Sequence, residues 1–213
     1  MRETVRRAYD EMAEAYATSS NTAWEVPFSD ELAAGLKTGS RILDVGCGDG
    51  RPVSVRFQDR FAVTGVDISR EQLRLASEEV PDTALVQGEM TTLPFEASTV
   101  DAVVALYSII HVPREEHPAV FAEWARVLRP GGWVLFSSGT AAFAGRNPNW
   151  LDSGVEMVWS YPGPDETTAA LEAAGFELET TAEIPDPLAE EGTKQFFLAR
   201  LSDPQPINAG AGN

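Results

Sequence analysis

The sequence predicts an α/β fold built on a doubly wound, mostly parallel sheet. Three observations lead to this prediction. From residue 41 onward, short apolar runs of strand length alternate with helical patterns, as expected for parallel strands joined by right-handed crossovers. The run "VDAVVALYSII" is too uniformly apolar to keep one face in water. The first run, "RILDVGCGDG", ends in three alternating glycines, which is typical of a strand-to-helix turn that lies close to a ligand.

The chain ahead of this first strand is predicted to be helical. Between residues 4 and 16, apolar side chains recur at the i, i+3, i+4 spacing of an amphipathic helix. A loop over "NTAWEVPF" and a short helix over residues 31–36 follow, and the turn signal "KTGS" ends the segment. We therefore expect residues 1–38 to form an N-terminal helical cap on the sheet.

The remaining strands and helices alternate. Strands are expected over "RILDVG", "FAVTGVDIS", "TALVQGEM", "VDAVVALYSII", "WVLFSS", "FELETTAEI" and "QFFLARL", which gives a seven-stranded sheet. Helices are expected over "RPVSVRFQDR", with Pro52 in its first turn, and over "SREQLRLASEEV", with Ser69 as its N-cap. Two more are expected over "EHPAVFAEWARVL", which the turn "RPGG" ends, and over "ETTAALEAAG", with Gly175 as its C-cap.

Residues 139–165 interrupt the alternation with Gly, Pro, Asn and two Trp, and we expect them to form a mobile, substrate-side insert. Residues 204–213 are expected to be a disordered tail. Because the sequence shows neither an internal repeat nor an interdomain linker, residues 1–203 are predicted to form a single domain.

Charge and composition limit the partners. The 33 acidic residues outnumber the 16 basic ones, so the net charge of −17 repels the phosphates of nucleic acids. An acidic, lysine-poor surface resembles proteins of salt-loving organisms, and the alternative is an acidic protein from a mesophile with a GC-rich genome. With no membrane-length apolar run, no secretory signal pattern and a single cysteine, we expect a cytoplasmic protein that binds neither membrane nor metal.

The glycine turn discriminates between two classes of cofactor. Gly46, Gly48 and Gly50 follow the first strand, but the third glycine position of a dinucleotide motif is occupied by Arg51. Asp44, ahead of the first glycine, would repel a pyrophosphate and attract a cation. The spacing therefore disfavours a nicotinamide dehydrogenase and favours a cationic ligand that lies along the turn.

"LDVGCGDG" resembles the first motif of class I S-adenosylmethionine-dependent methyltransferases, and the resemblance extends over residues 5 to 200. It implies S-adenosylmethionine as the cofactor and an antiparallel last strand. Asp67 matches the acid that takes the ribose hydroxyls, "QGEMTTLPF" is similar to the segment near the adenine, and "ALYSIIHV" resembles the motif under the methionine moiety. "YDEMAEAYA" resembles the helix that closes over the cofactor. The cofactor-binding residues that this implies are Asp44, Gly46, Cys47, Gly48, Gly50, Asp67, Ile68, Glu89, Met90, Leu106 and Tyr16. The family usually has Asp at the position of Glu89, so Met90 is the firmer contact.

Several of these residues also have a purely structural interpretation. Asp44 would cap local backbone N–H groups, and Asp67 would cap the helix that starts beside it. Cys47 is interpreted as a small turn residue rather than a nucleophile. Tyr9 and Tyr16 lie on the apolar stripe of their helix, where core packing competes with cofactor contact.

The predicted function is methyl transfer from S-adenosylmethionine to a small-molecule acceptor. The alternative is a non-catalytic protein that binds the cofactor or another nucleoside on the same fold. His111, expected at the end of the fourth strand, is a candidate general base, although an alternative role as a structural or substrate-lining residue is favoured. The predicted substrate-binding residues are Tyr107, His111, Trp150, Trp159 and Tyr161.

Overall fold

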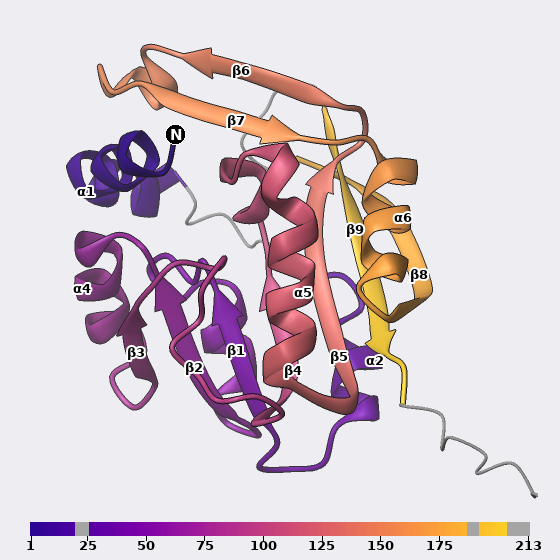
Figure 1. The fold of residues 1–213 in the computed structure, drawn as a ribbon. Coiled ribbons are helices and arrows are strands. Elements are labelled where there is room, and N and C mark those ends of the chain that lie inside the picture. Colours follow the sequence, from indigo (N-terminus) through magenta and orange to yellow (C-terminus); the bar gives the residue numbers. More distant parts are fainter. Residues whose placement is uncertain (20–25, 187–191, 204–213) are drawn as a thin grey trace, which may run out of the picture.

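A computed structural model describes residues 1–19, 26–186 and 192–203 (Figure 1). The N-terminal part contains α1 (Arg2–Ser19) and α2 (Ser29–Gly35). The first half of the sheet contains β1 (Arg41–Val45), α3 (Val53–Phe57), β2 (Ala62–Asp67), α4 (Arg70–Glu79), β3 (Ala84–Gln87) and β4 (Val100–Ala105). The second half contains the 3-10 turns η1 (Ile109–His111) and η2 (Arg114–Glu116), then α5 (His117–Val127), β5 (Leu128–Gly139), β6 (Phe143–Asn147), η3 (Trp150–Asp152), β7 (Met157–Tyr161), α6 (Pro164–Ala173), β8 (Phe176–Pro185) and β9 (Thr193–Leu201).

The main sheet has seven strands in the order β3-β2-β1-β4-β5-β9-β8. The first five are parallel, and β9, the last in the chain, is antiparallel to both β5 and β8. The predicted fold class is therefore confirmed, including the antiparallel last strand. Strand order reverses beside β1, which pairs with β2 on one side and β4 on the other, and a ligand cleft opens at such a switch point.

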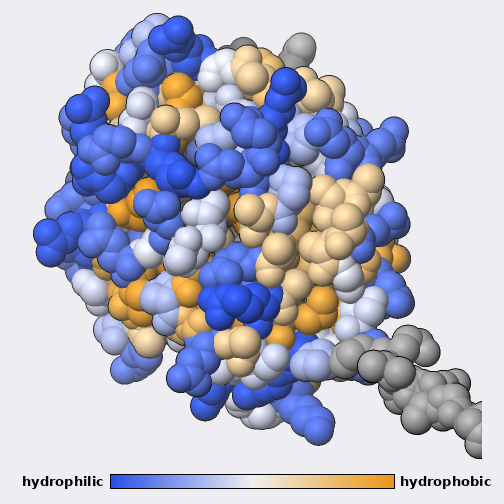
Figure 2. Space-filling view, in the orientation of Figure 1, coloured by the Kyte–Doolittle hydropathy of each residue, from blue (hydrophilic) through white to orange (hydrophobic). Residues whose placement is uncertain are grey.

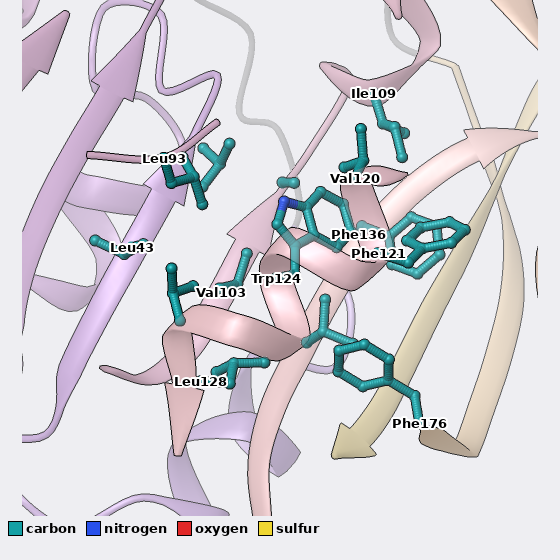
Figure 3. Close-up of a cluster of buried hydrophobic side chains, with 14 of the residues drawn as sticks. Leu43, Leu93, Val103, Ile109, Val120, Phe121, Trp124, Leu128, Phe136 and Phe176 are labelled. Atoms are coloured by element: carbon teal, nitrogen blue, oxygen red, sulfur yellow. The ribbon is translucent and has the colours of Figure 1, made fainter. Parts of the chain in front are cut away.

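Apolar clusters pack on both faces of the sheet. On one face α5 contributes Phe121 and Trp124, which point toward Phe136 of β5 (Figure 3). On the other face α2 and α3 contribute Leu32 and Phe57. Burial of large side chains on both faces stabilises the sheet whose strand ends carry the site.

The fourth strand is shorter than its apolar run predicts. It ends at Ala105, Tyr107 takes a left-handed φ of 55°, and His111 lies in the 3-10 turn η1 instead of at a strand end. Two hydroxyl groups replace the strand pairing: the Tyr107 N–H donates to Ser137 Oγ at 2.7 Å, and Ser108 Oγ donates to the Val45 carbonyl at 2.8 Å. A run of apolar residues indicates burial, and these hydrogen bonds decide the backbone conformation.

The insert after β5 is also different from its prediction. In place of an irregular mobile loop, β6 and β7 form an antiparallel ladder from Phe143 opposite Tyr161 to Asn147 opposite Met157. Figure 1 shows this pair lying across the same end of the molecule as α1. Met157 is fully buried against Val5 and Met12 of α1, so apolar packing on that helix holds the ladder in place.

The predicted helix boundaries have mixed outcomes. Ser69 is the N-cap of α4 as predicted, since its hydroxyl accepts the Gln72 N–H, and Gly175 follows α6 with a φ of 92°. The "RPGG" residues lie within β5 and do not precede it, since Leu128 already pairs with Val100 of β4. They still form an irregularity, because the register shifts before Trp133 pairs with Ala102 and Gly131 has a φ of 72°. The proposed tail, 204–213, and most of the predicted loop after α1 lie outside the described residues. None of the described helices combines the length and apolar character that crossing a membrane requires.

Candidate functional site

A cavity opens at the carboxyl ends of β1, β2 and β4, beneath α1. Its empty volume, open mouth included, is about 770 Å³, which suits a ligand of drug or cofactor size. Its wall consists of Arg2, Val5, Tyr9, Tyr16, Val45, Gly46, Gly48, Val66, Asp67, Ile68, Gln72, Gly88, Glu89, Met90, Thr91, Leu106, Tyr107, Ser108, His111 and Val112.

The glycine turn after β1 brings backbone, rather than side chains, to the cavity. The N–H of Gly46 donates to the Val66 carbonyl at 2.7 Å, which ties the turn to the end of β2. Gly46 has a φ of 79°, and a Cβ there would overlap the side chain of Ser108. Gly48 has a φ of 55°, but a Cβ there would meet only the Gln72 side-chain oxygen at 3.5 Å, so its Cα faces open cavity.

Asp67 organises the turn and also faces the cavity. Its Oδ2 accepts the Gly48 N–H at 2.9 Å, and its Oδ1 accepts the Ser69 N–H at 2.8 Å. Burial raises the pKa of the Asp67 carboxyl to about 6, against the opposing effect of these backbone hydrogen bonds. Each carboxylate oxygen keeps a second lone pair, so the group can still accept hydrogen bonds from a ligand. Helix capping is done by Ser69, and the capping alternative for Asp67 is wrong.

Three of the predicted cofactor residues lie outside the cavity wall. Asp44 is buried behind the turn, where Ser54 Oγ donates to its Oδ2 at 2.8 Å, and burial raises its pKa to about 7. Gly50 has a φ of 89°, and a Cβ there would lie 2.8 Å from a methyl of Val80. The Cys47 thiol is also buried, which raises its pKa well above the ordinary value, as expected for a small packing residue rather than a nucleophile.

Glu89 and Met90, of the segment predicted to lie near the adenine, are in the cavity wall. Ile68, after β2, and Leu106, after β4, are in the wall as well. Glu89 is exposed and pairs with Arg2 at 3.3 Å between Oε2 and Nε. The carboxylate therefore points toward α1. No local pattern in the sequence predicts this ion pair, because its partners lie on segments far apart in the chain.

Polar contacts near the start and in the middle of α1 help to hold this helix over the cavity. Near its start, Arg2 pairs with Glu89 and with Glu116. In its middle, Asp10 Oδ1 accepts from Ser69 Oγ at 2.7 Å and from the Arg70 N–H at 3.0 Å, so it caps the N-terminus of α4 from another helix. Sequence reasoning missed Asp10, because its partners lie about 60 residues away in the chain. The same helix contributes Tyr9 and Tyr16 to the cavity wall.

His111 is held by hydrogen bonds on both ring nitrogens. Nδ1 lies 2.8 Å from the Val158 carbonyl, and Nε2 lies 3.0 Å from the Tyr9 hydroxyl. Because a carbonyl can only accept, the neutral ring carries its proton on Nδ1, and Nε2 accepts from the Tyr9 O–H. Burial lowers the pKa of His111 to about 4, against the opposing effect of the bond to Val158. His111 thus joins α1, the turn after β4 and strand β7.

The aromatic residues of the insert lie outside the cavity wall. Trp159 lies behind His111, with ring centroids 5.9 Å apart, and its other face meets Trp150 at 5.4 Å. Tyr161 lies at the far end of β7, against Phe143 and above Gly139. Of the predicted substrate residues, the structure therefore brings only Tyr107 and His111 to the cavity. Trp159 and Tyr161 are two residues apart and share one face of β7, so their positions along the ladder, and not strand alternation, separate the ring beside His111 from the ring over Gly139.

Two further features belong to this site. Gln72, on the first turn of α4, is 1% exposed, and neither atom of its side-chain amide has a hydrogen-bond partner among the residues the structure describes. Within 1–19, 26–186 and 192–203, no group of three or more His, Cys, Asp or Glu side chains could hold a metal ion. The chemistry of the site is therefore that of an acid, amides, phenols and a neutral imidazole.

Comparison with known proteins identifies the relatives of this chain. A family described as "Methyltransferase domain" matches residues 42–132, which contain the glycine turn, Asp67 and His111. The chain is 33% identical to 27-O-demethylrifamycin SV methyltransferase of Amycolatopsis mediterranei over 70% of its own length and 58% of that protein. It is 32% identical to sterol 24-C-methyltransferase ERG6B of Gibberella zeae over 79% of its own length and 47% of that protein. The chain spans about half the length of the curated relatives it matches.

Among solved structures, the fold is similar to that of the [4+2]-cyclase SpnF. The TM-score is 0.71 at 18% identity, over 93% of this chain and 95% of the other. At this identity the likeness concerns the fold alone. A relative described as a cyclase also means that the fold by itself does not specify methyl transfer.

Proposed function

The chain belongs to the class I S-adenosylmethionine-dependent methyltransferase family, and we propose that it transfers a methyl group from S-adenosylmethionine to a small-molecule acceptor. The observation that carries the proposal is the cavity in which an open glycine turn, the Asp67 carboxylate and the Tyr9–His111 pair meet at the switch point of the sheet. We further propose that residues 1–203 act as one methyltransferase domain.

The residues of the cavity fit this cofactor. Asp67 retains lone pairs for the ribose hydroxyls, and the open Cα of Gly48 leaves space for a group lying along the turn. Met90 and Ile68 would contact the adenine, while Gly46 and the backbone after Leu106 would hold the methionine portion. Asp44, although it lies behind the turn, adds negative charge within the site, which favours a cationic ligand once the carboxyl is ionised.

S-adenosylmethionine, when bound, supplies a methyl group on a sulfonium centre, which is an intrinsically good leaving group. Rate enhancement then depends mainly on how the protein orients the acceptor and excludes water. Helix α1 does both, because Tyr9 and Tyr16 form the cavity wall and Asp10 fixes the helix to α4. The rings of Trp150 and Trp159 support α1 and His111 from behind.

His111 is proposed as a positioning residue rather than the general base. With a pKa of about 4 it is neutral at physiological pH, and its only lone-pair nitrogen already accepts the Tyr9 hydroxyl. The pair therefore fixes the direction of the Tyr9 O–H. The Tyr9 hydroxyl also interacts with Tyr16, and its oxygen keeps one lone pair for a donor on the acceptor molecule. A pH–rate profile in which His111 titrates above pH 5 would instead support His111 as the general base.

The acceptor is proposed to be a small molecule. The two relatives described above are methyltransferases whose names give a rifamycin and a sterol as substrates, and the volume of the cavity beneath α1 suits a small molecule. A net charge of −17 disfavours nucleic acids and suits a protein adapted to high salt. Figure 2 shows hydrophilic residues over much of one face, beside a hydrophobic area in its right half. The single cysteine supports a cytoplasmic location.

Calorimetry with S-adenosylmethionine, S-adenosylhomocysteine and NAD tests the cofactor, since binding of NAD in place of the other two would overturn it. Release of S-adenosylhomocysteine during incubation with fractionated metabolite pools then tests transfer. The second candidate, a nucleoside-binding protein that transfers no methyl group, is favoured by the cyclase that shares the fold. Micromolar binding of S-adenosylmethionine, with no release of S-adenosylhomocysteine in any metabolite fraction, would support that candidate.

A further inference from the structure

We propose that Met157 is a positioning residue of the proposed methyl transfer, which from outside the cavity holds α1, and with it Tyr9 and Tyr16, in the cavity wall. The inference rests on the proposed function and adds to it a role for the insert after β5. No local pattern in the sequence points to Met157, because its partners lie near the start of the chain.

The first observation is an apolar cluster that is separate from the two cores of the sheet. Met157, on β7, is 0% exposed, and the other buried members of its cluster are Val5, Ala8, Met12 and Tyr16 of α1. The partly buried members come from α1, η3, β7 and the segment between η3 and β7. Within the described ranges, the cluster therefore contains no residue of the seven-stranded sheet. The apolar face of α1 is thus packed against the insert.

The second observation is that this cluster borders the cavity although the insert does not reach it. Val5, Tyr9 and Tyr16 belong both to the cluster and to the cavity wall. The insert, residues 139–165, is described throughout and contributes no residue to that wall. Met157 therefore influences the site through α1 and not by contact with a ligand.

Met157 differs from the polar contacts of α1 in its burial. The side chains of Arg2 and Asp10 are 38% and 23% exposed, so solvent weakens their contributions. Met157 has no exposed surface, and truncation of a fully buried Met leaves a cavity that its neighbours fill only in part. Because those neighbours belong to α1, Met157→Ala should raise the open population of this helix by a factor of about 30 or more. Met157→Leu conserves the volume and should restore most of the packing.

The same packing couples the ligand state of the cavity to the insert. A ligand that contacts Tyr9 and Tyr16 stabilises the docked position of α1. The docked helix in turn supplies the apolar surface on which Met157 and the β6–β7 ladder pack. Binding of S-adenosylhomocysteine should therefore slow the hydrogen exchange of β7, although no residue of β7 lies in the cavity wall.

Hydrogen exchange followed by mass spectrometry, with and without S-adenosylhomocysteine, tests the inference in wild type, Met157→Ala and Met157→Leu. In the ligand-free proteins, exchange of the α1 amides should rise about 30-fold or more in Met157→Ala and return close to wild type in Met157→Leu. Saturating S-adenosylhomocysteine should protect β7 in wild type and Met157→Leu, and much less in Met157→Ala. Leu171→Ala is the matched control: Leu171 is also 0% exposed, but it packs in the cluster that contains Phe121 and Trp124. This control should lower the melting temperature without changing the exchange of α1 or the effect of the ligand on β7.

Equal exchange of α1 in wild type and Met157→Ala, or no protection of β7 when S-adenosylhomocysteine binds to wild type, overturns the inference. Equal effects of Met157→Ala and Leu171→Ala on α1 assign Met157 to overall stability and overturn it as well. If Met157→Ala does not fold, Met157→Val, which leaves a smaller cavity, replaces it in the same comparisons. Failure of wild type to bind S-adenosylhomocysteine overturns the proposed function, whereas the hold of Met157 on α1 is measured in the ligand-free protein.

Discussion

The interhelical cap made by Asp10 should control how often α1 opens away from the cavity. Its Oδ1 accepts three hydrogen bonds at the start of α4, from Ser69 Oγ at 2.7 Å, the Arg70 N–H at 3.0 Å and the Glu71 N–H at 3.4 Å. The longest bond contributes little, and the Asp10 side chain is 23% exposed, so solvent weakens the other two. We expect Asp10→Ala to destabilise the docked state of α1 by about 2 kcal/mol, within the range of a lost helix cap.

A change of about 2 kcal/mol corresponds to a roughly 30-fold larger open population. Hydrogen exchange followed by mass spectrometry should show this factor in the amides of α1 and leave β4 and β5 unchanged, because local opening exposes only the helix that undocks. Affinity for S-adenosylhomocysteine should fall as well, since Tyr9 and Tyr16 leave the cavity wall with α1. Asp10→Asn keeps the Oδ1 acceptor and loses the charge, so it should cost about 0.3–1 kcal/mol.

A second pair of residues between the same helices supplies the control. Glu14 and Arg74 form an ion pair at 2.6 Å, but the Glu14 side chain is 77% exposed. An exposed ion pair contributes little to stability, so Glu14→Ala should leave the exchange of α1 nearly unchanged. Equal effects of Asp10→Ala and Glu14→Ala, or faster exchange throughout β4 and β5, would refute the reasoning that the Asp10 cap contributes more to the docking of α1 than an exposed ion pair does.

Three other predictions concern the support of the site, its ionisation and its surface. Trp159→Ala removes the ring behind His111, so it should sharply lower turnover while the affinity for S-adenosylhomocysteine, measured by calorimetry, stays within about threefold; an unfolded variant would instead assign the ring to the core. The pKa of Asp67 in the ligand-free protein is about 6 and ribose hydroxyls need the ionised acceptor, so affinity should fall as pH drops below 6, with proton release on binding; an affinity independent of pH from 5 to 7 would contradict this. With a net charge of −17, the melting temperature should climb as KCl rises from dilute to molar, because salt screens acid–acid repulsion, and a flat curve would show that the surface is not salt-adapted.

The sequence by itself determined the layers of the fold and the location of the turn. Apolar runs of strand length alternating with amphipathic helices are local patterns, and a parallel sheet with crossovers is the arrangement that buries all of them. The glycine pattern of the turn is also a local signal, since the turn itself requires a positive φ at Gly46 and Gly48. The cap at Ser69 was predictable for the same reason, because donor and acceptor are three residues apart.

Only the tertiary structure decided which side chains meet at the cavity. A carboxylate beside a glycine turn can face the ligand or the core, and packing turned Asp67 to the cavity and Asp44 toward Ser54. Tyr9 and His111 are 102 residues apart, and no periodicity relates them. The fourth strand ended early because the Ser137 hydroxyl of β5 accepts the Tyr107 N–H and the Ser108 hydroxyl donates to the Val45 carbonyl of β1. The insert became a ladder because α1 offered it an apolar surface. A local pattern specifies which face of a segment is apolar, but the partner of that face depends on contacts that close long loops, and these form only when the whole chain is folded.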